Sequence, residues 1–308
     1  MSLRVSLCYP GADPTPWLAG LRERMPSAQV ENWVDGAALA DYGVVWAPSQ
    51  QFFDQQTQLK AVFNIGAGVD RLLSLRLPAN LLVVRLDDAG MGVQMAEYVC
   101  HAVARHFREF DAYAVQARQG QWLQRAPRLR AQFTVGIMGL GVLGVRVAAA
   151  LKMFDYPLVG WSRTARQLDG VRCYSGAENL GDFLAATRLL VCLLPLTPET
   201  RNILDINTLA QLQPGSYVVN VARGDLLIED DLLALLDSGH IAGATLDVFR
   251  TEPLPSRHPL WRHPAVQVTP HTSAQTLEAA SMAQIASKIL AMQRGEPVSG
   301  MVDFSRGY

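Results

Sequence analysis

The chain has 308 residues, of which 49% are hydrophobic and 18% charged, and its formal net charge is -1. This length suits two domains of ordinary size, and the composition is typical of a globular protein and excludes a disordered one. The balanced charge gives no reason to expect nucleic acid or a membrane as a partner, and we expect neither a secretory signal nor a membrane-spanning segment.

The first hundred residues alternate apolar, strand-like runs with helical patterns. This repeated order of strand and helix predicts a parallel sheet that is covered on both faces. Strands are expected at residues 3–9, 30–34, 44–47, 61–65 and 81–86, and helices at 17–25 and 69–75. Residues 92–118 carry apolar positions at helical spacing, which predicts one long helix. The polar residues 120–131 are expected to form a surface connector.

A second series of strands and helices follows. Its strands are expected at residues 134–138, 158–161, 189–194, 217–221, 244–248 and 266–269, and its helices at 142–153, 229–236 and 277–293. Gly239 stands where a helix C-cap is expected after the second of these helices. The pattern predicts a complete dinucleotide-binding domain, but it does not decide where the final helix packs.

The first strand of this series runs into a G-x-G-x-x-G loop formed by Gly139, Gly141 and Gly144. The motif alone is weak, but here it follows an apolar strand and opens a predicted helix. The first glycine permits a tight turn, the second leaves room for a pyrophosphate, and the third lets helix and strand approach closely. The helix N-terminus then offers N–H groups to the phosphates, which predicts a bound dinucleotide.

The end of the next strand bears on which dinucleotide is bound. NAD sites usually place Asp or Glu there, whereas this chain has Ser162 and Arg163, with Arg166 nearby. Arginine donates paired hydrogen bonds to a 2′-phosphate, which a carboxylate would repel. These arginines could also be ordinary surface charges, but the pattern favours NADPH.

Three polar side chains follow later strands, where ligands of open α/β sheets bind. Arg223 suits binding of a substrate carboxylate and carbonyl, and His271 suits proton donation to a developing alkoxide. Glu252 could hold the other imidazole nitrogen. Each residue has a structural alternative, as a surface charge, a loop histidine or a solvated loop acid, and spacing alone does not show that they meet.

Further motifs occur in order along almost the whole chain. They are NIGAGVD at residues 64–70, the glycine loop, WSRT at 161–164, LPLTPET at 194–200, VARG at 221–224, LDVF at 246–249, EPLP at 252–255, PH at 270–271 and RGY at 306–308. With these motifs the chain resembles the D-isomer-specific 2-hydroxyacid dehydrogenase family, and most closely its glyoxylate and hydroxypyruvate reductase branch.

The resemblance implies roles for individual residues. Arg223, Glu252 and His271 would be catalytic, with Arg223 and His271 also contacting the substrate. The other implied substrate contacts are Trp46, for which a core position is the alternative, and the loop residues Ala67, Gly68 and Val69. The implied cofactor contacts are Gly139, Gly141, Val142, Leu143, Gly144, Ser162, Arg163, Leu194, Pro195, Thr200, Val221, Arg223 and Asp247, the last at the nicotinamide end.

The resemblance also implies an architecture of two doubly wound α/β domains. A Rossmann NADP-binding domain at residues 99–275 would be inserted into a flavodoxin-like substrate domain at 1–98 plus 276–308, with the active site between them. Members are typically homodimers, which makes the helix at 92–118 a candidate interface. Trp122 could then reach a partner's pocket or be a simple linker aromatic.

The implied activity is NADPH-dependent reduction of glyoxylate to glycolate and of hydroxypyruvate to D-glycerate, in the cytoplasm and without a metal. Thr272 and Ser273 stand where relatives commonly carry small apolar residues, which leaves the substrate preference open. Two alternatives remain. One is a dehydrogenase of another 2-oxo acid, and the other is a non-enzymatic NADP-sensing module on the same fold. The scattered residues Cys8, Cys100, Cys173 and Cys192 are expected to be buried free thiols.

Overall fold

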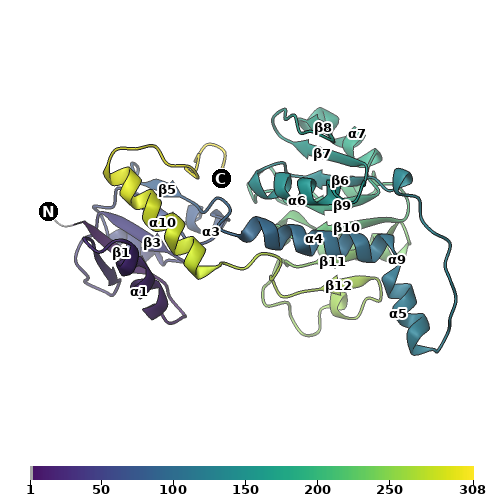
Figure 1. Ribbon diagram of the computed structural model, residues 1–308, viewed down its shortest axis with the longest axis horizontal. Helices are drawn as coiled ribbons and strands as arrows, with labels where there is room; N and C mark the ends of the chain where they lie inside the picture. Colours follow the sequence, from purple (N-terminus) through teal and green to yellow (C-terminus); the bar gives the residue numbers. More distant parts are fainter. Residues whose placement is uncertain (1–2) are drawn as a thin grey trace. The chain divides into compact units, whose positions relative to one another are not determined.

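The computed structural model describes residues 3–308, and the chain forms two compact units (Figure 1). The first unit runs to Met91 and resumes at Thr276–Tyr308, and the second comprises Gly92–Gln275. The boundary expected after residue 98 falls inside α4, Met91–Phe107, nearly all of which belongs to the second unit. The binding roles expected of the two units remain predictions.

The described part of the first unit contains a five-stranded parallel sheet with the order β2-β1-β3-β4-β5. This is the flavodoxin-like order, in which helices cover both faces of the sheet. The strands are β1 Arg4–Cys8, β2 Gln29–Asn32, β3 Tyr42–Val45, β4 Ala61–Asn64 and β5 Leu82–Val84, and the helices are α1 Thr15–Arg24, α2 Gln50–Gln55, α3 Asp70–Leu73 and α10 Glu278–Gln293. The short helix α2 was not predicted.

The C-terminal part of the chain completes this first unit. Helix α10 packs on α1 at Gly20, where a Cβ atom would lie 2.4 Å from the sulfur of Met282. Beyond α10, the backbone of Gly300 and Val302 forms hydrogen bonds of 2.9 Å with residues of and just after β5, and the Val302 side chain is buried in the core. Residues separated by two hundred positions in the sequence therefore share one core.

Among the described residues, the second unit contains a seven-stranded parallel sheet with the order β12-β11-β10-β9-β6-β7-β8. Six of its strands follow the Rossmann order, with one more at an edge. The strands are β6 Val135–Met138, β7 Leu158–Ser162, β8 Val171–Ser175, β9 Leu189–Cys192, β10 Ser216–Asn220, β11 Ile241–Leu246 and β12 Val266–Val268. Strand β8 was missed because it is a half-exposed edge strand without a clear apolar run. The two sheets confirm the predicted fold class.

The helices of the second unit cover both faces of its sheet, and alternate residues of β6 enter two separate hydrophobic clusters. Val135 and Ile137 pack with α4 and α6, whereas Met138 lies in the cluster that contains residues of α9. The α-helices after α4 are α5 Phe110–Arg118, α6 Val142–Lys152, α7 Leu180–Ala185, α8 Ile206–Leu209 and α9 Glu229–Asp237. Short 3-10 turns occur at Arg130–Gln132, Ala177–Asn179, Gly224–Leu226 and Pro259–Trp261.

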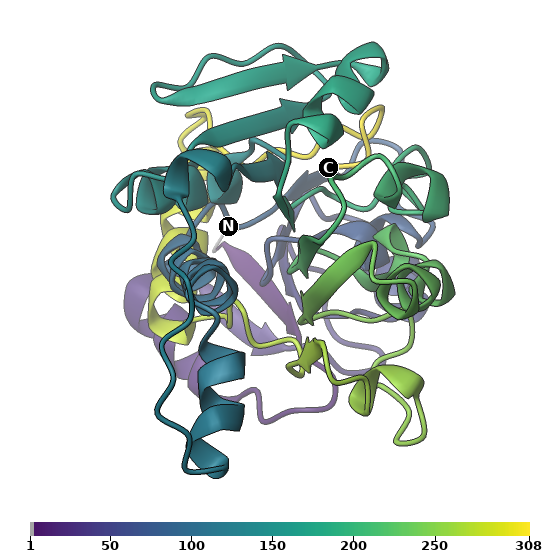
Figure 2. The same ribbon diagram turned by 90° about the vertical axis from the view of Figure 1, so that its right-hand side faces the viewer.

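The prediction of one long helix over residues 92–118 is wrong. The helix breaks between α4 and α5, where Glu109 adopts a left-handed backbone with φ of 56°. Helix α5 has no buried residue and, together with the connector that follows it, projects from the rest of the second unit (Figures 1 and 2). The connector is held by Arg125 and Arg128, which both form ion pairs with Glu109. Within residues 3–308, no helix combines the length and the apolar character needed to cross a membrane.

Candidate active site

The glycine loop after β6 has the geometry that its sequence predicts. Gly139 has a φ of +110°, and a Cβ atom there would lie 2.7 Å from the carbonyl oxygen of Leu193. A Cβ at Gly144 would lie 1.9 Å from the carbonyl oxygen of Gly139, so helix α6 can approach the strand only with glycine there. Gly141 instead faces open space immediately before α6. The loop therefore offers helix N-terminal N–H groups and room for a dinucleotide phosphate.

The candidate ribose contacts lie at the end of the neighbouring strand β7. Ser162 is half-buried and donates a 2.8 Å hydrogen bond to the carbonyl of Thr164, and Arg163 is exposed. A hydrogen bond from Thr197, and to a smaller extent the charge of Arg163, lowers the pKa of Glu199. A hydroxyl and a guanidinium thus stand together at this strand end, a donor set that fits a 2′-phosphate.

The LPLTPET segment forms a tight turn after β9. The hydroxyl of Thr200 donates to the carbonyl of Pro195 over 2.7 Å and accepts the backbone N–H of Thr197 over 2.8 Å. Leu194 is buried at the start of this turn. Thr200 therefore shapes the turn, and its proposed cofactor contact, like those of Leu194 and Pro195, remains a prediction.

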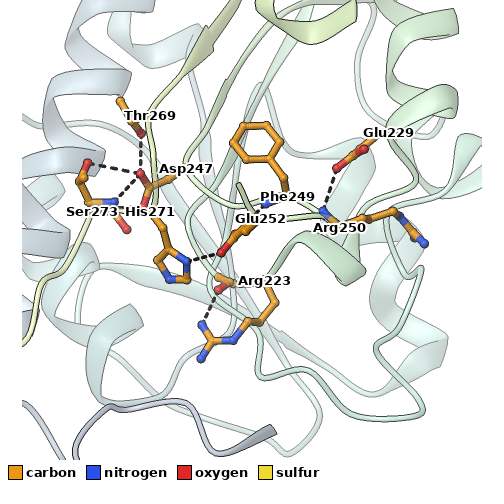
Figure 3. Close-up of polar contacts among 11 residues, drawn as sticks. Arg223, Glu229, Asp247, Phe249, Arg250, Glu252, Thr269, His271 and Ser273 are labelled. Atoms are coloured by element: carbon orange, nitrogen blue, oxygen red, sulfur yellow. Dashed lines mark hydrogen bonds and ion pairs between the residues drawn. The ribbon is translucent and has the colours of Figure 1, made fainter. Parts of the chain in front are cut away.

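His271 and Glu252 lie in direct contact (Figure 3). Nδ1 of His271 is 2.9 Å from Oε2 of Glu252, while the other oxygen of Glu252 accepts the backbone N–H of Phe249 over 3.0 Å. The carboxylate is thus fixed on one side and orients the imidazole ring on the other. The His271 side chain is 45% exposed, which leaves it accessible to a substrate.

Arg223 follows β10 and lies beside the same pair, where its guanidinium donates a 2.7 Å hydrogen bond to the carbonyl of Ala222 (Figure 3). The buried side chain of Asn220 shapes its turn, because the Asn220 amide donates to the carbonyl of Arg223 over 3.1 Å and accepts from Ala222 N–H over 3.2 Å. A Cβ at Gly224 would lie 1.9 Å from the carbonyl carbon of Phe249. Glycine at this position therefore allows the loops after β10 and β11 to meet and brings Arg223 toward Glu252.

The carboxylate of Asp247 is completely buried and binds the segment around His271. It accepts the hydroxyl of Thr269 over 2.5 Å and the backbone N–H groups of Thr272 and Ser273 over 2.8 Å each. Both of its oxygens therefore hold the loop that carries His271. The cofactor contact expected of Asp247 remains a prediction, and the same holds for Val221.

The candidate substrate residues of the first unit form their own local arrangement. Trp46 is 43% exposed, which argues against the core position that was its alternative. Its ring lies against Gly66, where a Cβ atom would be 2.7 Å away. The buried Asn64 amide donates to the carbonyls of Gly66 and Gly68 over 3.0 and 2.9 Å. Asn64 thereby holds the carbonyl side of the 66–69 loop, a role that the sequence analysis missed.

Comparisons with known proteins agree with this geometry. Residues 100–273 match the family described as D-isomer specific 2-hydroxyacid dehydrogenase, NAD binding domain. The chain is 46% identical over 313 aligned residues to glyoxylate/hydroxypyruvate reductase A of Serratia proteamaculans, covering 99% of this chain and 100% of that protein. The chain belongs to the D-isomer specific 2-hydroxyacid dehydrogenase family.

Solved structures of family members are similar over their whole length. One is a D-isomer specific 2-hydroxyacid dehydrogenase from Xanthobacter autotrophicus in complex with NADPH and MES, with a TM-score of 0.94, 39% identity and full coverage of both chains. Another is the NADPH-dependent glyoxylate/hydroxypyruvate reductase of Sinorhizobium meliloti in complex with NADP and sulfate, with a TM-score of 0.93 and 35% identity over 99% of this chain and 100% of that one.

In this dehydrogenase the second unit brings together Arg223, Glu252 and His271, and it places the glycine loop and Ser162 at the ends of other strands of the same sheet. The sequence analysis missed Asn220, the last residue of β10 directly before the VARG segment, because a buried amide has no sequence signal of its own. Among the described residues, no group of three or more histidine, cysteine or acidic side chains is arranged to hold a metal ion.

Proposed function

We propose that this dehydrogenase is an NADPH-dependent reductase that converts glyoxylate to glycolate and hydroxypyruvate to D-glycerate. The observation that carries the proposal is the 2.9 Å contact between His271 and Glu252, with Arg223 beside it, on a sheet that also bears the glycine loop. The names of the relatives from Serratia and Sinorhizobium support the same substrates.

The chemistry assigns one task to each side chain. Arg223 binds the substrate carboxylate and polarises its carbonyl with paired hydrogen bonds. His271 donates the proton on Nε2 to the carbonyl oxygen, while Glu252 holds the Nδ1–H and stabilises the charged ring before transfer. When bound, NADPH supplies the hydride that the carbonyl carbon accepts. The proton and the hydride together complete the 2-hydroxy acid.

The first unit is proposed to contribute to substrate binding. Within residues 3–308, the backbone N–H groups of Ala67, Gly68 and Val69 donate no hydrogen bond to the protein, although Asn64 holds the loop's carbonyls. Such N–H groups are donors that suit a carboxylate. Trp46 beside this loop would limit the size of the substrate's side chain.

The cofactor residues fit NADPH better than NADH. Gly141 leaves open space at the start of α6, and Ser162 with Arg163 offers donors where an acidic residue would repel a 2′-phosphate. We assign the phosphates to residues 139–144 and the 2′-phosphate to Ser162 and Arg163.

A panel of 2-oxo acids tests the proposal. Initial rates of NADPH and NADH oxidation would be measured with glyoxylate, hydroxypyruvate, pyruvate and 2-oxo acids of larger side chain. We expect the two smallest hydrophilic substrates with NADPH to give the highest kcat/KM. A preference for larger acids would establish the first alternative. NADPH binding without oxidation in the presence of any substrate would establish a sensing module.

We further propose a homodimer in the cytoplasm. The exposed apolar side chains on α5 and its connector are the surface that a second copy would cover, and Trp122 is 96% exposed there. Apolar patches of this kind are typical of protein–protein interfaces. Light scattering of wild type and of a Phe110→Ser, Trp122→Ser variant tests this assembly, since only the variant should be monomeric. The four free cysteines fit a reducing compartment.

A further inference from the structure

Helix α4 contacts the segment that carries His271 through two side chains. The hydroxyl of Tyr98 lies 2.5 Å from the hydroxyl of Thr269. The amide of Gln94 forms two hydrogen bonds with the backbone of Gln275, at 2.9 and 3.1 Å. Because Gln94 and Tyr98 are four residues apart, they lie on one face of the helix. This face therefore holds the segment before and after His271.

The hydrogen bonds that link Tyr98, Thr269 and Asp247 all donate toward Asp247. The Thr269 hydroxyl donates its only proton to the carboxylate of Asp247, because a carboxylate only accepts. Tyr98 must therefore donate to Thr269. Burial raises the pKa of Tyr98 to about 12, so its phenol keeps this proton near neutral pH. The two hydrogen bonds, from Tyr98 to Thr269 and from Thr269 to Asp247, form a partly buried chain in which each bond polarises the next.

Asp247 accepts the last hydrogen bond of this chain and also binds the backbone of the His271 loop, through its main-chain carbonyl and through its carboxylate. Its main-chain carbonyl accepts the N–H of His271 over 2.8 Å, and its carboxylate accepts the N–H groups of Thr272 and Ser273 (Figure 3). His271 has a φ of +56°, a left-handed backbone that is unfavourable for residues other than glycine. The loop keeps this conformation because the surrounding hydrogen bonds fix it.

We infer that Tyr98 is a positioning residue of the reductase. By donating to Thr269 it fixes the carboxylate of Asp247, which holds the His271 loop in the conformation that sets the imidazole against Glu252. The inference rests on the proposed function only in taking His271 as the proton donor. Tyr98 lies outside every motif that identified the family, and its role follows from the contacts of α4.

The variant Tyr98→Phe tests this role, since it removes one hydroxyl and keeps the ring. We expect kcat for glyoxylate to fall about tenfold, because small misplacements of a proton donor are costly, while the KM values for glyoxylate and NADPH stay within about twofold. Thr269→Val should reproduce the loss, and Thr269→Ser, which keeps the hydroxyl, should restore most of kcat. The double variant Tyr98→Phe, Thr269→Val should be no slower than Thr269→Val alone, because both changes interrupt the same chain of hydrogen bonds.

A matched control exists in the same unit, between strands β10 and β11. The hydroxyl of Tyr217 lies 2.8 Å from that of Thr245, and both are buried, but this pair has no hydrogen bond to Asp247. Tyr217→Phe therefore removes an equivalent tyrosine–threonine hydrogen bond. We expect it to lower thermal stability about as much as Tyr98→Phe does while leaving kcat unchanged.

The outcomes separate this inference from the proposed function. If wild type reduces glyoxylate and Tyr98→Phe keeps its kcat, or loses no more than Tyr217→Phe, the inference is overturned while the function stands. If wild type reduces no 2-oxo acid, the function fails, and the inference is decided by NMR of the His271 ring, identified by its loss in His271→Asn. The ring resonance should shift in Tyr98→Phe and not in Tyr217→Phe, and an unshifted resonance overturns the inference.

Discussion

The strands of the seven-stranded sheet end at a carboxyl edge and begin at an amino edge, and a histidine lies at each. The two side chains have opposite surroundings. At the carboxyl edge His271 is 45% exposed and bound to Glu252. At the amino edge His106 stacks on Tyr217 with 4.2 Å between ring centroids and adjoins Phe133. Burial there, with the charges of Arg128 and Arg188, lowers the pKa of His106 to about 4.

This difference shows how one sheet separates chemistry from stability. An acidic partner and solvent access make an imidazole useful for proton transfer, whereas aromatic neighbours and nearby arginines keep it neutral and make it a packing group. Changes at the carboxyl edge should therefore alter catalysis with little effect on folding, and changes at the amino edge should do the reverse.

The largest effect is expected from His271→Asn. Asparagine tolerates the left-handed backbone that His271 adopts, so the loop should keep its shape while the proton donor is lost. We expect kcat for glyoxylate to fall about a thousandfold, with the melting temperature nearly unchanged. Steady-state kinetics and thermal melts check both values. A variant that kept a tenth or more of wild-type kcat would show that His271 is not the proton donor.

Arg223→Lys should have the next largest effect. Lysine keeps the positive charge but loses the paired hydrogen bonds of the guanidinium, so kcat should fall and the KM for glyoxylate should rise. The lower kcat and the higher KM together should reduce kcat/KM about a hundredfold. Arg201→Lys is the matched control. Arg201 forms an exposed ion pair with Asp225, which lies two positions after Arg223 in the chain. Equal losses in the two variants would contradict the role of Arg223.

At the amino edge, His106→Phe should change the pH dependence of stability and leave activity intact. The pKa of His106 is lower in the folded chain than its unfolded value near 6.5, so between about pH 6.5 and 4 the unfolded chain binds the extra proton. Its contribution to stability is therefore lost as the pH falls through this range. From pH 7 to 5, wild type should lose about 2 kcal/mol more unfolding free energy than the variant.

Urea unfolding at several pH values would measure this difference. Phenylalanine preserves the stack on Tyr217, so the variant should fold and should retain wild-type kcat. Parallel pH profiles for the two proteins would mean that His106 binds its proton as readily in the folded chain as in the unfolded chain, and the contrast between the two edges would disappear.

The smallest effect is expected at the end of β7. Replacing both Ser162 and Arg163 with alanine should raise the KM for NADPH about tenfold, because the 2′-phosphate loses its donors. The KM for NADH should stay near its wild-type value and serves as the internal control. An equal rise for both cofactors would remove the basis for NADPH preference.

The sequence predicted those parts of the fold whose signal is local. The buried strand β9 is a continuous apolar run, β10 has an apolar centre, and the glycine loop is recognisable by the spacing of its glycines. Strand β8 gave no such signal, because its residues are only partly buried or exposed at the sheet edge. The break between α4 and α5 at Glu109 also gave no signal in the sequence, because the apolar spacing continues on either side of this one left-handed residue.

The site divides in the same way. Strand ends identified Arg223, Glu252 and His271 as candidates, since parallel strands collect their carboxyl ends at one edge. The contact of Tyr98 with Thr269 could not be predicted, because it joins a helix to a loop 171 positions away in the sequence. The supporting roles of Asn64 and Asn220 likewise depend on tertiary packing, which a sequence motif does not show.

The way the C-terminal segment completes the first unit has a consequence for biosynthesis. The core of that unit includes Val302, and α1 packs on α10, so its earliest strands leave the ribosome long before their final partners exist. The second unit, Gly92–Gln275, is continuous, and all of its strands leave the ribosome before α10 does. Folding during translation should therefore proceed from the middle of the chain, and the strands made first should be the last to become protected from proteases.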